Sequence, residues 1–206
     1  LILRPFRSGK EWQKLDHESE NDQDHLKKHE IHRLPGNDPH IWLDPLNAQK
    51  IIQNLVQILS DLDPENANTY HSNGKKTILR LSDLNIQLET KMSSVSSKSY
   101  IVFHDAYQYF EKRYKLNPIA SVTASPGHST SVGRLIDIRK KIKIKNVLCI
   151  FTEPQFSPKL VQTVISGTTV KTGILDPIGT SIPPGPEMYF TLLNNISHSI
   201  STCFKK

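Results

Sequence analysis

Imidazole and carboxylate side chains stand at the ends of three apolar runs in this sequence. His104, Glu153 and Asp176 each come directly after such a run. The runs alternate with helical patterns, which predicts parallel strands whose carboxyl ends open onto one crevice. We therefore expect the three side chains to face the same space. Imidazole nitrogen and carboxylate oxygen bind divalent ions such as zinc, so the pattern predicts a metal site.

His40 is a further candidate ligand. It lies within residues 37–45, between a turn signal and the start of a helix, and Ile-Trp-Leu follows it directly. A histidine in a tight turn backed by a tryptophan is held on a rigid element, as a metal ligand needs to be. The other interpretation is a helix-entry histidine that bonds nearby backbone, and the residues alone leave both open.

The strand-end candidates also have plainer interpretations. His104 precedes Asp105, a good N-cap for a following helix, and a histidine at a strand end is often simply hydrogen-bonded in place. Asp176 and Glu153 each precede a proline, as turn formers and salt-bridged loop carboxylates do. If His104 binds zinc, a partner on its other ring nitrogen would fix the tautomer, and Glu153 is a candidate for this supporting role.

The sequence offers little to an enzyme. It contains no glycine-rich phosphate loop, nucleophile elbow, Cys-x-x-Cys pair or His-Glu-x-x-His helix. A zinc hydrolase would need an open coordination position with a general base beside it, and Glu153 is the only candidate base. We therefore expect a protein that binds a metal ion and is not an enzyme.

Length and charge narrow the class further. The 206 residues, 36% apolar and 22% charged, suffice for one folded domain or one and a part. The net charge of +6 is scattered, and its densest stretch, residues 139–145, contains no aromatic residue. That pattern is typical of the solvated face of a helix and not of a nucleic-acid site. No apolar run reaches the roughly 18 residues of a membrane span.

Two Asp-Pro pairs mark helix starts in the first half. Asp44-Pro45 and Asp63-Pro64 each combine an N-cap with a proline at the first helical position. The second helix runs to about Met92 and has a thin apolar stripe for its length, which suits a rigid connector. The apolar face of the first helix is formed by Ile51, Ile52, Leu55, Val56 and Leu59.

Strand and helix patterns alternate regularly from residue 99 onward. These units predict an α/β fold, a four-stranded parallel sheet with helices on both faces. We expect residues 98–206 to form this metal-binding lobe, and residues 38–97 to be a remnant of an N-terminal lobe with the connector helix. The predicted strands are 99–103, 118–123, 146–151 and 169–175, and the predicted helices are 105–114, 130–143, 157–166 and 187–203.

Residues 1–37 show no sustained period of either kind. A polar tract at positions 16–32 mixes acidic residues with His17, His25, His29 and His32. Such a tract buries too little apolar surface to offset its ordering entropy, so we expect residues 1–37 to be a mobile segment.

The two cysteines, Cys149 and Cys203, fall in a predicted core strand and in the last predicted helix. Their spacing is equally compatible with two buried thiols and with a disulfide. A disulfide would indicate an oxidising compartment.

Four motifs in a fixed order give the chain a resemblance to a known family. They are Asp-Pro-His-Ile-Trp-Leu-Asp-Pro at 38–45, Tyr-Ile-Val-Phe-His-Asp-Ala-Tyr-Gln-Tyr-Phe-Glu at 100–111, Glu-Pro-Gln-Phe at 153–156 and Leu-Asp-Pro-Ile-Gly-Thr at 175–180. From about residue 37 to the end, the chain resembles the ZnuA family, the zinc-specific periplasmic substrate-binding proteins of bacterial ABC importers.

The resemblance implies a two-lobed α/β protein with a long helix joining the lobes and Zn²⁺ in the cleft between them. It assigns His40 and His104 to two of the family's histidine ligands and Asp176 to its carboxylate ligand. It further implies a periplasmic monomer that delivers zinc to the membrane permease of an ABC transporter.

Two more features match the family. The tract that carries His17, His25, His29 and His32 is similar to the family's His-rich loop, an auxiliary metal site. Cys149 and Cys203 match a pair that zinc-type members join in a disulfide. Two imidazoles with one carboxylate also favour zinc, because manganese-type relatives usually have a carboxylate at the position of His104.

The start of the chain departs from the family. Family members carry a further β/α lobe, with the first histidine ligand, ahead of the His-rich loop, and nothing in residues 1–15 matches it. The apolar stretch at residues 1–3 is too short for a signal peptide. We therefore expect the C-terminal part of such a protein with an unrelated start. A non-transporting remnant with weak metal binding and a manganese-type binding protein remain as alternatives to a zinc-binding importer component.

Overall fold

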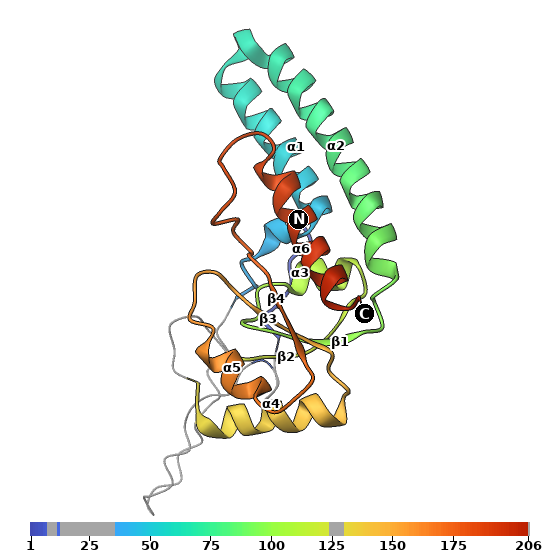
Figure 1. Ribbon diagram of the computed structural model, residues 1–206. Coiled ribbons are helices and arrows are strands. Elements are labelled where there is room, and N and C mark those ends of the chain that lie inside the picture. Colours follow the sequence, from blue (N-terminus) through green and yellow to red (C-terminus); the bar gives the residue numbers. More distant parts are fainter. Residues whose placement is uncertain (8–11, 13–35, 124–129, 206) are drawn as a thin grey trace, which may run out of the picture.

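Four parallel strands form the sheet that carries the candidate ligands (Figure 1). The structure is a computed structural model that describes residues 1–7, 12, 36–123 and 130–205. The strands lie in the order β2-β1-β3-β4, and every neighbouring pair is parallel. The predicted four-stranded parallel sheet is therefore confirmed. The strands are β1 (Ser99–Val102), β2 (Asn117–Ser121), β3 (Cys149–Thr152) and β4 (Lys171–Ile174).

Helices cover both faces of this sheet. On one face lie α3 (Gln108–Arg113) and α6 (Met188–Cys203), and on the other lie α4 (Val132–Ile144) and α5 (Lys159–Ile165). The alternation of side chains along β1 produces the two cores: Tyr100 and Val102 belong to the first cluster, Ile101 and Phe103 to the second.

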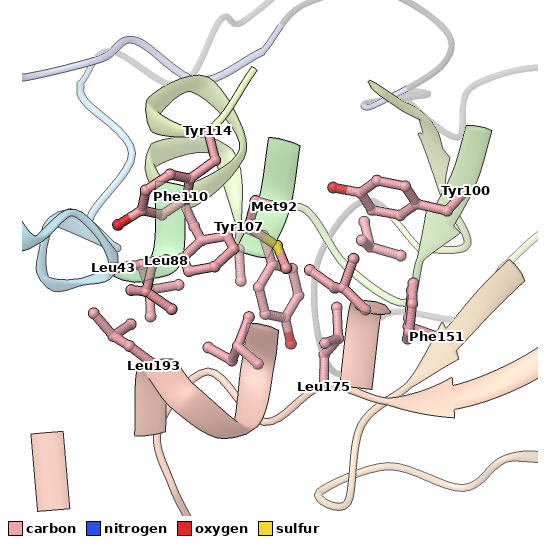
Figure 2. Packing of buried hydrophobic residues seen from close by; sticks show 14 of the residues in the cluster. Leu43, Leu88, Met92, Tyr100, Tyr107, Phe110, Tyr114, Phe151, Leu175 and Leu193 are labelled. Carbon is pink, nitrogen blue, oxygen red and sulfur yellow. The ribbon is translucent and has the colours of Figure 1, made fainter. Parts of the chain in front are cut away.

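The first cluster is the larger of the two. Figure 2 shows how Leu88 and Met92 of α2 (Ala67–Ser93), Phe110 of α3 with Tyr107 just before it, and Leu193 of α6 approach one another. Each of these side chains is at most 1% exposed. Each contributes about 1.5–3 kcal/mol of burial free energy before entropy is counted, so this cluster fixes the helices that flank the strand ends.

Two long helices precede the sheet. A short helix, η1 (Ile41–Leu43), leads into α1 (Pro45–Leu62), and η2 (Pro64–Asn66) leads into α2 (Ala67–Ser93). The expected start of α1 is confirmed, because Asp44 caps it by accepting a hydrogen bond of 2.9 Å from the Leu46 N–H. In Figure 1, α1 and α2 lie side by side and extend away from the sheet.

The predicted apolar face of α1 is only partly used in packing. Ile51, Ile52 and Val56 are half-buried, whereas Leu55 and Leu59 are 46% and 40% exposed. On α2 the apolar stripe is deeper, with Leu84 and Leu88 in the first core cluster.

The helix after β1 begins later than expected. It was predicted from residue 105 with Asp105 as N-cap, but α3 begins at Gln108 and its N-cap, Tyr107, makes no side-chain hydrogen bond. The reason is a long-range ion pair: Asp105 lies 2.9 Å from Arg7 Nη2 and does not turn back onto the helix. Between β1 and α3 the backbone forms a turn, which is closed by a hydrogen bond of 2.9 Å from the Ala106 N–H to the His104 carbonyl oxygen.

Residues 1–7 are tied to the rest of the chain, although the sequence pattern places them in a mobile segment. The Ile2 N–H donates to Asn47 Oδ1 at 2.6 Å, and Pro5 forms an antiparallel bridge with Asn37. Arg7 forms the ion pair with Asp105 described above. The apolar surface of residues 1–3 remains about half exposed.

The disulfide implied by the family resemblance is present. Cys149 of β3 and Cys203 at the end of α6 are bonded, with their Cα atoms 6.2 Å apart. The bond fastens the last helix to a central strand. Among the described residues, no helix has both the length and the apolarity that a membrane crossing requires.

Candidate metal centre

Two histidines from distant parts of the chain meet at the carboxyl ends of the strands. His40 lies in the turn before η1, and His104 follows β1. Their ring centroids are 5.5 Å apart. His104 is 7% exposed. This approach brings two imidazoles within reach of one ion.

Each imidazole is held by a buried carboxylate through its Nδ1 atom. His40 Nδ1 lies 2.6 Å from Asp38 Oδ1, and His104 Nδ1 lies 2.7 Å from Glu153 Oε1. A carboxylate can only accept, so each Nδ1 carries the hydrogen and each Nε2 keeps a lone pair. Carboxylate-held imidazoles of this kind are the usual arrangement in zinc sites.

Both carboxylates are themselves positioned. Asp38 is 1% exposed, and its Oδ1 also accepts the backbone N–H of His40 at 3.0 Å. Glu153 is 2% exposed and accepts the Tyr107 hydroxyl at 3.2 Å. Burial, with the nearby Glu153 carboxylate as the second cause, raises the pKa of Tyr107 well above its ordinary value, so the phenol remains a donor.

Asp176 lies nearby but is engaged with its own turn. Its carboxylate accepts the backbone N–H groups of Ile178, Gly179 and Thr180 and the side-chain amide of Gln155. Within the described part of the chain, no three His, Cys, Asp or Glu side chains are grouped closely enough to hold a metal ion. The structure thus brings His40 and His104 together but leaves Asp176 outside a finished ligand group.

A hydrogen bond nevertheless joins the His40 turn to the Asp176 turn. Trp42 Nε1 donates to the carbonyl oxygen of Pro177 at 2.8 Å. Trp42 also packs edge-on against His40, with ring centroids 5.4 Å apart. The Trp42 indole therefore contacts both His40 and Pro177, the residue that follows Asp176.

A buried group of charges borders the histidine pair. Arg7 bonds the carboxylate of Glu111 and lies 2.9 Å from that of Asp105. The Tyr100 hydroxyl donates to Glu111 at 2.9 Å. Burial raises the pKa of Asp105 to about 7, and the positive charge of Arg7 opposes that rise. Arg7 thus balances carboxylates immediately behind His104.

Sequence reasoning missed several residues that act here. Glu153 was expected as a supporting residue and lies against His104, whereas the partner of His40, Asp38, was not expected. The signal available was the spacing, because Asp38 stands two residues before His40 across a proline. Nothing in the sequence indicated the role of Gln155 apart from its place in the Glu-Pro-Gln-Phe motif. The predicted auxiliary ligands His17, His25, His29 and His32 lie outside the described residues.

The donor chemistry of this site suits a borderline-soft ion. The imidazole nitrogens of His40 and His104 are donors that zinc accepts in four-coordinate sites. Neither cysteine contributes, since both are in the disulfide.

Comparison with known proteins points in the same direction. A family model described as ZnuA, "Zinc-uptake complex component A periplasmic", matches residues 6–203. A high-affinity zinc uptake system protein ZnuA of Brucella suis is 40% identical over 169 residues, which are 82% of this chain and 51% of that protein. The chain spans about half the length of that relative.

Solved structures share the fold. A mutant of the laminin-binding adhesin Lmb of Streptococcus agalactiae aligns with a TM-score of 0.73 at 27% identity, covering 83% of this chain and 64% of that one. A ZnuA deletion mutant with zinc bound aligns with a TM-score of 0.71 at 26% identity, covering 84% and 64%.

The matched range corrects one expectation. The family model begins at residue 6, so the prediction that the similarity starts near residue 37 and that the first residues are unrelated is wrong. In the structure, the Arg4 carbonyl accepts a hydrogen bond of 2.8 Å from the Asp38 N–H, and Arg7 forms an ion pair with Asp105, the residue after His104. These first residues support the candidate centre.

Proposed function

The chain belongs to the ZnuA family, and on this premise we propose that it binds Zn²⁺ through His40, His104 and Asp176 and hands the ion to an ABC-type membrane permease. The zinc ion is cargo in this proposal, and the protein is a binding component and not an enzyme. The observation that carries the proposal is the pair of adjacent imidazoles, each held through Nδ1 by a buried carboxylate.

The orientation of the two rings favours binding through Nε2. Because Asp38 and Glu153 occupy the Nδ1 atoms, neither imidazole can offer that nitrogen to a metal. The carboxylates also fix the orientation of the rings that they hold, and removal of such a partner typically costs about 10–100-fold in metal affinity. Two preset imidazoles therefore supply most of the site before the ion arrives.

Asp176 is the third ligand in this proposal. Its turn is joined to the His40 turn by the hydrogen bond from Trp42 to Pro177, which restrains the distance between the carboxylate and the imidazoles. Three protein donors leave a fourth position for water or for a donor outside the described residues.

Zinc is favoured over manganese by the donor set. Imidazole nitrogen suits zinc, whereas manganese prefers sites rich in carboxylate, carbonyl and water oxygen. The zinc-bound ZnuA variant among the structural relatives is consistent with this choice.

Two observations support a periplasmic location. The family description is periplasmic, and the disulfide between Cys149 and Cys203 persists in oxidising surroundings. We propose a periplasmic location, where His17, His25, His29 and His32 would act as weaker, auxiliary zinc ligands.

X-ray absorption at the zinc edge tests the ligand assignment. The chain loaded with one equivalent of zinc is expected to show nitrogen and oxygen neighbours only, with multiple scattering from two imidazoles. The His104→Ala variant is expected to lose one imidazole. A spectrum with no imidazole, or one that does not change in the variant, would contradict the proposal.

A further inference from the structure

One turn contacts both halves of the proposed site. It follows β3 and spans residues 153–156, so that Glu153 holds His104 while Gln155 donates to Asp176. The turn is closed by a hydrogen bond of 3.2 Å from the Phe156 N–H to the Glu153 carbonyl oxygen. A movement of Gln155 relative to Glu153 is therefore restricted.

The aromatic ring at the end of this turn anchors it. Phe156 stacks on Phe103 with ring centroids 5.0 Å apart, and it meets His104 edge-on at 6.3 Å. The turn is thus packed against the residues that end β1. Gln155 stands on a rigid support, as a residue that sets ligand geometry requires.

The two oxygens of Asp176 are not equivalent. Oδ2 accepts one hydrogen bond, from the Thr180 N–H at 2.6 Å. Oδ1 lies within hydrogen-bond distance of four donors: Gln155 Nε2 at 2.7 Å, Gly179 N at 3.0 Å, Ile178 N at 3.2 Å and Thr180 Oγ1 at 3.4 Å. An ionised carboxylate oxygen offers about two lone-pair positions, so Oδ1 is saturated and Oδ2 keeps one free.

Gln155 closes a ring of hydrogen bonds around Oδ1. Its Nε2 donates to Asp176 Oδ1 and also to Thr180 Oγ1, at 2.6 Å, and the Thr180 hydroxyl in turn faces Asp176 Oδ1. The other amide atom, Gln155 Oε1, is buried and has no hydrogen-bond partner in the described part of the protein. An unpaired buried acceptor costs stability, so folding alone does not account for this amide.

We propose that Gln155 sets the metal selectivity of the site by holding Asp176 as a ligand that offers one oxygen, Oδ2. The inference rests on the proposed function and deepens it. With Oδ1 occupied, the site supplies two imidazole nitrogens and a single carboxylate oxygen. This set matches the low coordination number of zinc.

Loss of the Gln155 amide is expected to change the number of oxygens that Asp176 offers to an ion. Without Gln155 Nε2, Oδ1 loses its shortest hydrogen bond, and the Thr180 hydroxyl loses the donor that orients it. The backbone N–H groups of Gly179 and Ile178 remain on Oδ1 at the longer distances of 3.0 and 3.2 Å, and an ion displaces such bonds more easily. Asp176 then binds an ion through both oxygens more readily than in the wild type. A second carboxylate oxygen raises the coordination number and favours manganese, which prefers octahedral oxygen-rich sites.

The test compares zinc and manganese in the full chain. Zinc affinity is measured by competition with a chelator, and manganese affinity by the magnetic resonance signal of the free ion. In Gln155→Ala we expect the preference for zinc over manganese to fall by about tenfold, the lower range for loss of an outer partner of a metal ligand. Gln155→Met, which keeps the side-chain length but has no donor, is expected to behave alike. Gln162→Ala, at an exposed glutamine of α5, is the matched control.

The visible absorption spectrum of the Co²⁺ complex reports the coordination number of the bound ion, and a general loss of structure would not produce the same change. The wild-type Co²⁺ complex is expected to show the intense visible bands of four-coordinate cobalt, and the Gln155→Met complex the weak bands of higher coordination. An unchanged zinc preference together with unchanged cobalt bands would overturn the role of Gln155 while leaving zinc binding by His104 intact. Zinc binding that is insensitive to His104→Ala would overturn the proposed function and this inference with it.

Discussion

Trp42 Nε1 donates a hydrogen bond of 2.8 Å to the carbonyl oxygen of Pro177. The two residues are 135 positions apart, and each adjoins a proposed ligand. Trp42 follows His40 by two residues, and Pro177 follows Asp176 directly. The bond therefore sets the distance between the imidazole side and the carboxylate side of the site before any ion binds.

Replacement of this donor is expected to weaken zinc binding without unfolding the chain. Trp42→Phe removes the N–H and keeps an aromatic ring, so the cost is about 1 kcal/mol for the hydrogen bond, or roughly fivefold in affinity. A chelator competition measures the zinc affinity, and far-UV circular dichroism checks the fold. An unaltered zinc affinity in a folded variant would show that the two turns are not coupled through the indole.

The carboxylate behind His104 gives a second prediction. Glu153→Gln keeps the shape but weakens the partner of Nδ1, so zinc affinity should fall by about 10–100-fold. Glu65→Gln, at an exposed glutamate of η2, is the matched control and should change nothing. Equal zinc affinities in the two variants would mean that Glu153 does not support the ligand.

The turn before α1 depends on a buried ion pair. Arg113 donates from Nε and Nη2 to both oxygens of Asp44, at 2.9 and 2.8 Å, and Asp44 is 0% exposed. Arg113→Ala leaves that carboxylate unpaired, so the free energy of unfolding should fall by about 3–5 kcal/mol. Lys112→Ala, at the exposed neighbour on α3, should have little effect. Chemical denaturation followed by fluorescence measures both, and equal stabilities would refute a structural role for the pair.

The disulfide is expected to stabilise the fold without touching the metal. It closes a loop with a sequence separation of 54 between Cys149 and Cys203, and neither cysteine is a proposed ligand. The double variant Cys149→Ala/Cys203→Ala should lose about 2–4 kcal/mol of unfolding free energy and keep its zinc affinity at low temperature. A marked loss of affinity in the folded double variant would tie the disulfide to the site.

Local sequence signals predicted most of the fold. Alternation of apolar runs with helical patterns predicted the four parallel strands, and the signal was clearest at β1 and β3, which are short and mostly apolar. The start of α1 could also be predicted from local sequence, because the Asp44 cap and Pro45 act within the first turn of the helix.

The missed features depend on contacts between distant residues. Asp105 was taken as a helix cap because that is its local preference, but Arg7 draws it into an ion pair. Likewise Leu55 and Leu59 fit an apolar helix face, while their exposure is decided by which elements pack against α1. The role of Gln155 depends on a side-chain position that no spacing rule supplies, whereas the spacing of Asp38, two residues before His40, was an available signal that the prediction did not use.

The most direct measurement is a zinc titration of the metal-free chain against a competing chelator, run for the wild type, His40→Ala, His104→Ala and His71→Ala. His71 is exposed on α2, away from the strand ends, and serves as the control. We predict one tight zinc per chain, with an affinity lowered by at least about tenfold in the His40 and His104 variants and unchanged in the control. Equal affinities in all four proteins would contradict the assignment of this histidine pair as the zinc site.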